Sequence, residues 1–160
     1  MRISRSGVVF GPRTVVVLAE RHGVATDLAA VVEAGARSVA EKLGIRSVYA
    51  SYCPIFLPSP HHRPHPLPGR PLPPEVTDKR VLNDLDVQSY NALFGEALNS
   101  HRASIGLPPV DNVRDHILTD HPWLAADPTL APWQESADLD VVQTLPRAMV
   151  AGDLRSELMP

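Results

Sequence analysis

The chain has 160 residues, of which 44% are hydrophobic and 21% charged, the proportions of one globular domain. Its net charge of −3 combines +5 over residues 1–80 with −8 over residues 81–160, and the basic residues stand singly without interleaved aromatics, which argues against a nucleic-acid partner. Cys53 is the only cysteine, which excludes an internal disulfide and a thiolate metal cluster and favours a cytoplasmic location, and no apolar run approaches the roughly 20 residues of a membrane span.

The first half of the chain predicts a strand, a helix and a second strand. Residues 14–19 form a short β-branched run, typical of a buried strand. Thr26 or Asp27 can cap a helix that continues to Leu43 and closes at Gly44. Residues 47–52 predict the second strand, and this order implies a right-handed parallel crossover and an α/β fold.

Residues 53–74 predict a loop that leaves the carboxyl end of the second strand. The segment contains nine prolines together with His61, His62 and His65. Because proline lacks a backbone donor and restricts the chain, the loop is expected to be extended and semi-rigid. Open α/β sheets place their ligand clefts at the carboxyl ends of strands, so this loop is a candidate binding region.

A long helix over about residues 80–104 follows, capped by Thr77 or Asp78 and stopped by Gly106 and Pro108–Pro109. One helical turn over residues 111–116 and two short strands, 123–126 and 141–144, complete the predicted sheet. The predicted apolar stripe of the long helix consists of Val81, Leu82, Leu85, Ala92, Leu93 and Ala97, widened by Tyr90, Phe94 and Leu98.

Several histidines and carboxylates are candidates for chemistry. His61, His62 and His65 have the composition of a zinc site, but adjacent imidazoles between prolines diverge, so solvated loop histidines, or hydrogen bonding to a ligand, are favoured over a metal. The neighbouring pairs Asp115–His116 and Asp120–His121 resemble acid–base pairs, yet sequence neighbours rarely converge, and structural roles are expected. No glycine-rich phosphate loop and no nucleophile elbow occur, so no catalytic residue is predicted.

Four segments carry a family resemblance. They are Arg-Ser-Val-Ala-Glu-Lys-Leu-Gly-Ile (37–45), Asn-Ser-His-Arg-Ala-Ser-Ile-Gly-Leu-Pro-Pro-Val (99–110), Thr-Asp-His-Pro-Trp-Leu-Ala-Ala-Asp-Pro (119–128) and Asp-Val-Val-Gln-Thr (140–144). Together they resemble the acceptor-side domain of actinobacterial glycosyltransferases that decorate vancomycin-type glycopeptides.

The resemblance implies a partial GT-B fold, in which two Rossmann-like domains face each other in the whole enzyme. Residues 26–144 would then form a truncated acceptor-binding Rossmann-like domain, a partial parallel sheet with flanking helices, between a divergent segment 1–25 and a divergent tail 145–160. The family's glycine-rich first turn and its carboxylate base are not recognised in residues 1–25, so no base is carried over. A nucleotide-sugar donor is expected only for the full-length enzyme.

The resemblance also implies a function, hexosyl transfer from a nucleotide sugar to a glycopeptide or other natural-product acceptor. Acceptor contacts are predicted at Tyr52, Cys53, Ser59, His61 and His62, and the isolated chain is expected to be inactive. The alternative is a non-catalytic binding module derived from that domain. A small metal-dependent hydrolase, supported only by the histidines, is a weaker third hypothesis.

Overall fold

The computed structural model describes residues 7–10, 14–19 and 26–144, with side chains from residue 34 onward. The divergent tail expected at 145–160 lies outside the described residues. Within the described part, no helix is long and apolar enough to cross a membrane.

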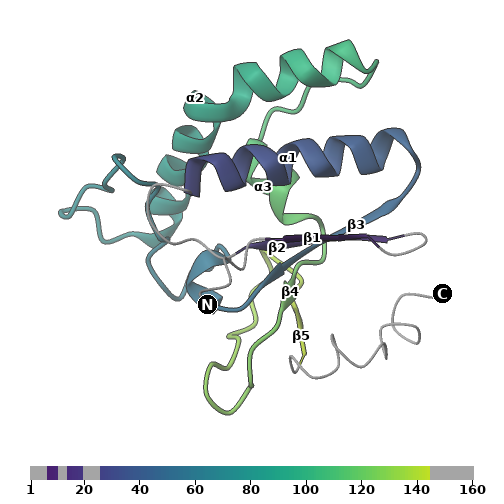
Figure 1. The fold of residues 1–160 in the computed structure, drawn as a ribbon. Helices are drawn as coiled ribbons and strands as arrows, with labels where there is room; N and C mark the ends of the chain where they lie inside the picture. The colour runs from purple at the N-terminus through teal and green to yellow at the C-terminus, as the bar shows by residue number, and fades with distance from the viewer. Residues whose placement is uncertain (1–6, 11–13, 20–25, 145–160) are drawn as a thin grey trace, which may run out of the picture.

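A five-stranded sheet in the order β1-β2-β3-β4-β5 forms the base of the fold (Figure 1). Its strands are β1 (Gly7–Phe10), β2 (Thr14–Ala19), β3 (Arg46–Ser51), β4 (Trp123–Leu124) and β5 (Val142–Gln143). Strands β2 to β5 pair in parallel, whereas β1 runs antiparallel to β2. The predicted α/β class is confirmed, and β1 is an additional strand that the sequence pattern did not predict.

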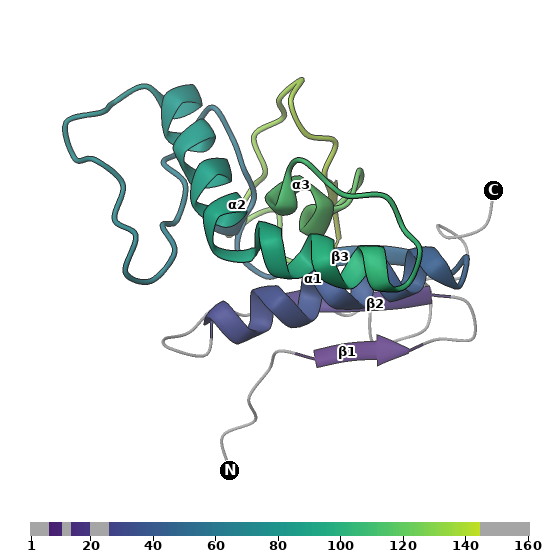
Figure 2. The same ribbon diagram turned by 90° about the horizontal axis from the view of Figure 1, so that it is seen from above.

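Helices cover one face of this sheet (Figures 1 and 2). They are α1 (Thr26–Lys42), α2 (Lys79–Ser104) and the short α3 (Val113–Leu118). Helix α3 contacts α1, α2 and β3, so it fills the space between the two long helices and the sheet. A 3-10 turn, η2 (Pro54–Phe56), follows β3.

The ends of the helices follow the local signals in the sequence. Asp78 caps α2, because its side chain accepts a hydrogen bond of 2.8 Å from the backbone N–H of Arg80. Gly44 and Gly106 have φ values of +64° and +74°, the left-handed conformation that closes a helix most readily with glycine. The predicted start and stop of α2 and the predicted stop of α1 at Gly44 are therefore confirmed.

The buried face of α2 differs from the predicted apolar stripe. Its buried residues recur every four positions: Leu82, Asp86, Tyr90, Phe94, Leu98 and Arg102. Val81 and Leu93 are 44% and 38% exposed, and Ala92 and Ala97 are also exposed, so the stripe through these four was wrong. The aromatic rings of the observed row bury more apolar area than the alanines of the predicted stripe would. Asp86 and Arg102 can be buried in the same row because each has an ionic partner.

Strand β3 is buried on both faces, as expected for a central parallel strand. Residues Val48 to Ser51 are each no more than 4% exposed. Tyr52, predicted as the last residue of the strand, lies just beyond it and is 42% exposed. The main core cluster joins Tyr49 of β3 with Tyr90 and Phe94 of α2 and with Ile117 of α3.

Candidate functional site

A cleft of about 640 Å³ opens where five segments of the chain meet. These are the loop after β3, the start of α2, α3, the α3–β4 connection and the β4–β5 connection. The lining residues are Pro58, Ser59, Pro60, Arg80, Asn83, Asp84, Arg114, Asp115, Thr119, Asp120 and residues 137–140. The size is that of a small-molecule site.

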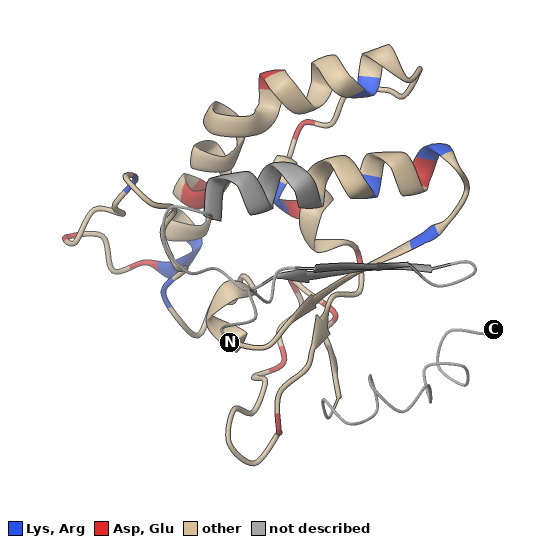
Figure 3. Ribbon diagram, in the orientation of Figure 1, with Lys and Arg blue, Asp and Glu red and all other residues tan. Residues whose placement is uncertain are grey.

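Carboxylates dominate the charged groups of this lining. Asp84, Asp115, Asp120, Asp138 and Asp140 face only two cations, Arg80 and Arg114. Figure 3 shows acidic residues at the start of α2 and along the β4–β5 connection. The cleft therefore carries a negative potential, which disfavours an anionic ligand.

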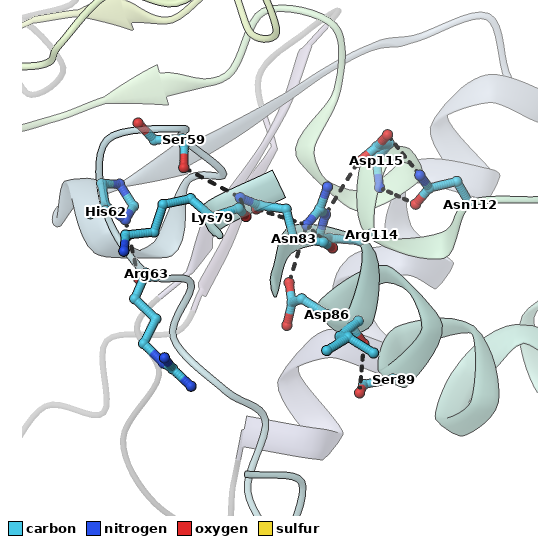
Figure 4. A network of polar contacts seen from close by, with 11 residues as sticks. Ser59, His62, Arg63, Lys79, Asn83, Asp86, Ser89, Asn112, Arg114 and Asp115 are labelled. Atoms are coloured by element: carbon cyan, nitrogen blue, oxygen red, sulfur yellow. Dashed lines mark hydrogen bonds and ion pairs between the residues drawn. The ribbon is translucent and has the colours of Figure 1, made fainter. Parts of the chain in front are cut away.

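A buried ion pair includes Arg114, one of the lining residues of the cleft (Figure 4). Arg114 Nη1 lies 3.3 Å from Asp86 Oδ2, and the two side chains are only 11% and 8% exposed. The same Nη1 donates to the backbone oxygen and to Oδ1 of Asn83, at 3.1 and 3.2 Å. Asn83 in turn donates 3.3 Å to the carbonyl of Ser59, so one network joins α3, α2 and the proline-rich loop.

Ser59 is the one predicted acceptor residue that lines the cleft. It is 3% exposed, and its hydroxyl oxygen accepts a hydrogen bond of 3.1 Å from the backbone N–H of His61. This turn directs the loop past the cleft wall. The predicted position of the loop at the carboxyl end of β3 is confirmed.

The three loop histidines point to three different partners. His61 Nε2 lies 3.2 Å from the backbone oxygen of Glu135, the ring of His62 meets Trp133 edge-on at 6.4 Å, and that of His65 meets Phe56 at 5.2 Å. Across the described residues, no group of three or more potential ligands could hold a metal ion. The contacts of His61 and His62 instead attach the proline-rich loop to the β4–β5 connection.

Tyr52 and Cys53 lie at the end of β3, outside the cleft lining. Tyr52 is exposed and Cys53 is half-buried. The hydroxyl of Ser51 donates to the Cys53 carbonyl at 2.9 Å, which shapes the turn after the strand. The structure thus brings Ser59 into the cleft, places His61 and His62 in the adjoining loop contacts, and leaves Tyr52 and Cys53 at the strand end.

The proline-rich loop folds back on itself, whereas an extended segment was predicted. Arg63 donates to the backbone oxygens of Leu72, Pro73 and Val76 at 2.6–3.2 Å. Leu67 is 2% exposed and belongs to the main core cluster. An arginine can satisfy several carbonyls at once, and this guanidinium closes the loop despite its prolines.

The two Asp–His neighbour pairs, for which structural roles were expected, do not form acid–base pairs. His116 is buried, and its Nε2 lies 3.3 Å from the hydroxyl of Ser38. Burial and the nearby Arg37 and Arg102 lower the pKa of His116 to about 4, so the ring is neutral at pH 7. His121 pairs with Asp140 at 3.1 Å on the surface, and Asp120 lines the cleft.

Residues of the two segments 37–45 and 99–110 form a structural network between α1 and α2. Arg102, 2% exposed, makes two hydrogen bonds to the Glu41 carboxylate, at 2.7 and 3.1 Å, which holds the pKa of Glu41 below its ordinary value. Arg102 also donates to the carbonyl of Pro108 at 2.7 Å, and Asn99 exchanges two hydrogen bonds with the backbone of Val110. These two segments therefore hold α1 against α2 and hold the loop that follows α2 in place, and their residues do not line the cleft.

Sequence reasoning missed Asn83 and Arg114, which line the cleft, and Asp86, the ionic partner of Arg114. Asp86 stands in the every-fourth-residue row of α2, and a charged residue in such a row is a signal for a buried partner. The partner itself lies 28 residues away, beyond the reach of any periodic pattern.

Comparison with known proteins gives no matching family model. Four curated proteins of Amycolatopsis orientalis are similar to this chain. Glycosyltransferase GtfE is 54% identical over a match that covers 69% of this chain and 27% of its own length. Vancomycin aglycone glucosyltransferase is 51% identical over a match that covers 69% of this chain and 26% of its own length. Glycosyltransferase GtfC is 50% identical over 78% of this chain and 31% of its own length. The resemblance predicted from the motifs is confirmed, and the matches span only about a quarter to a third of these relatives.

Proposed function

We propose that this chain, which is related to a segment of the vancomycin-type glycosyltransferases, forms part of the acceptor side of such an enzyme. The reaction would transfer a hexose from a nucleotide sugar to a glycopeptide or another natural-product acceptor. The observation that carries the proposal is the 51% identity to a protein named vancomycin aglycone glucosyltransferase. Residues 26–144, with the parallel strands β3 to β5 and helices α1 to α3, would represent part of a Rossmann-like domain of the GT-B fold.

The acceptor would bind in the cleft beside the proline-rich loop. Ser59 lines this cleft, and the contacts of His61 and His62 hold the loop against the β4–β5 connection. Tyr52 and Cys53, at the carboxyl end of β3, would extend the acceptor surface. This position follows the general rule for open parallel sheets.

Binding without transfer is the expected behaviour of the isolated chain. Sugar transfer needs a base for the acceptor hydroxyl and groups that stabilise the departing diphosphate, in addition to an aligned acceptor. The matched part of the chain spans 27% of the length of glycosyltransferase GtfE and 26% of that of vancomycin aglycone glucosyltransferase. The residues that line the cleft provide an acceptor wall. A cytoplasmic location, as for an enzyme that uses a nucleotide sugar, belongs to the same proposal.

Calorimetric titration of the purified chain with vancomycin aglycone tests this proposal. We expect saturable binding and no turnover of a nucleotide-sugar donor. Ser59→Ala should weaken binding by about fivefold through the lost hydroxyl, whereas Ser104→Ala, which removes an exposed hydroxyl at the end of α2, should leave it unchanged.

Two results would change the proposal. Absence of any binding at millimolar aglycone would contradict the acceptor role. Binding that is never followed by transfer, even when the donor-side half of a relative is added, would favour the alternative of a non-catalytic binding module.

A further inference from the structure

We propose that Arg114 is a ligand-binding residue of the cleft, whose Nη2 edge donates hydrogen bonds to a neutral oxygen, a peptide carbonyl or a hydroxyl. The ligand class is therefore a neutral peptidic or hydroxylated molecule. Its identification with the glycopeptide acceptor rests on the proposed function.

The guanidinium of Arg114 is fixed before any ligand arrives. Nη1 donates to Asn83 and contacts Asp86, and Nε lies 3.3 Å from Asp115 Oδ1, while the side chain is 11% exposed (Figure 4). Among the residues that the structure describes, none accepts a hydrogen bond from Nη2. Since its rotamer is already set, this edge can bind a ligand atom at little further cost in side-chain entropy.

The surrounding charges select the kind of atom that Nη2 can bind. Asp86, 8% exposed, already balances the guanidinium from below. Five carboxylates line the cleft, so a phosphate or carboxylate would bind against a negative potential. A neutral oxygen avoids this repulsion, and the same carboxylates can accept hydrogen bonds from amide or hydroxyl donors of the ligand.

Asn83 connects the Arg114 guanidinium, through Nη1, to the predicted acceptor region. Its side chain accepts from Arg114 at 3.2 Å and donates to the Ser59 carbonyl at 3.3 Å. A molecule that touches Ser59 in the cleft wall therefore lies beside a preorganised guanidinium. The cleft lining therefore offers one preorganised donor group, that of Arg114, together with several carboxylate acceptors.

The variant Arg114→Lys tests the inference in the 160-residue chain. Lysine keeps the positive charge opposite Asp86 but lacks the second, planar donor group. We expect vancomycin aglycone to bind the variant about ten- to a hundredfold more weakly by calorimetric titration, the range for hydrogen bonds to charged groups. Arg70→Lys, an exposed arginine of the proline-rich loop that does not line the cleft, is the matched control and should stay within about twofold of wild type.

Nitrogen-15 NMR of the arginine guanidinium groups in the wild-type chain provides a second measurement, which does not depend on the folding of a variant. The probes are vancomycin aglycone, a neutral tripeptide amide and inorganic phosphate. We expect the aglycone to shift the Arg114 signals and phosphate to leave them unchanged.

The outcomes separate the two proposals. Equal aglycone affinity of wild type and Arg114→Lys, or a shift with phosphate alone, would overturn the Arg114 inference and leave the acceptor role standing. A second outcome is that the tripeptide amide binds wild type more tightly than Arg114→Lys while the aglycone does not bind at all. This outcome would overturn the acceptor role and support the Arg114 inference. If the aglycone binds in the titration but no probe moves the Arg114 signals, the Arg114 inference is wrong and the acceptor role stands.

Discussion

Arg102 shows how a single buried charge organises the contact between two helices. Its guanidinium bonds Glu41 of α1 twice and also reaches the Ser38 hydroxyl and the Pro108 carbonyl. Burying an arginine is costly unless such partners exist, and removal of either ion then leaves the other without its counter-charge.

We expect Arg102→Met and Glu41→Gln each to lower the free energy of unfolding by about 2–3 kcal/mol, less than for a fully buried pair because Glu41 is 43% exposed. Urea unfolding measures the free energy of unfolding of both variants. The double variant should lose less of this free energy than the sum of the two single losses. Glu96→Gln, an exposed position on α2, is the control, with an expected change below about 0.5 kcal/mol. Additive losses would contradict a direct pair.

His116 makes stability depend on pH. Its folded-state pKa of about 4 lies below the ordinary value near 6.5, so the unfolded chain binds more protons between these values. The stabilisation is fully present above pH 6.5 and is lost as the pH falls toward 4. Between pH 7 and pH 4.5 wild type should lose about 2 kcal/mol more than His116→Gln, as measured by urea unfolding at both pH values.

His121→Gln is the matched control for this titration. His121 is 62% exposed, and replacing an exposed side chain is expected to change the free energy of unfolding by less than about 0.5 kcal/mol at either pH. Identical profiles for wild type and His116→Gln would show that His116 is not held neutral in the folded state.

At the scale of the element, two glycines are expected to respond in opposite directions to alanine. Gly35 lies within α1, and a Cβ atom there would meet nothing within 4 Å. Gly106 closes α2 at φ +74°, where a Cβ atom is strained. Gly35→Ala should raise the free energy of unfolding by about 0.5–1 kcal/mol, and Gly106→Ala should lower it by about 1 kcal/mol, both by urea unfolding.

Opposite signs for the two changes would show that α1 continues through Gly35 while Gly106 closes α2. A loss of stability in Gly35→Ala would contradict the open surroundings of that residue. The comparison uses the same substitution twice, so effects of alanine on the unfolded chain largely cancel.

The proline-rich loop illustrates the limit of composition as a guide to an element. Nine prolines predict an extended segment, and local preferences of proline support that expectation. The single side chain of Arg63, which bonds three carbonyls 9 to 13 residues away, instead closes the segment. A long-range polar contact thus outweighs the local preference.

At the scale of the whole molecule, ligand binding and folding should be linked. A ligand at a hundred times its dissociation constant raises stability by about 2.7 kcal/mol if it binds only the folded chain. For a chain of 160 residues this corresponds to a rise in Tm of about 5–10 °C. Vancomycin aglycone should give this shift in a thermal melt, and a nucleotide sugar alone should shift Tm by less than about 1 °C.

A melt in which only the nucleotide sugar raised Tm would contradict the assignment of this chain to the acceptor side. Leu130→Ser is a useful control in both melts. Leu130 is 85% exposed and does not line the cleft, so the variant should keep the aglycone shift.

The sequence by itself determined the order of the helices and strands from Thr14 to Gln143, the left-handed closing glycines, the α/β class and the relationship to glycosyltransferases. These features depend on local dihedral preferences, on caps within a few residues and on residue identity, all of which are written along the chain. Only the tertiary structure decided which face of α2 is buried, that Ser59 rather than Tyr52 reaches the cleft, and that Asn83 and Arg114 meet across 31 residues. Such contacts depend on how distant elements pack and share their charges, and no repeating pattern in the sequence encodes that distance.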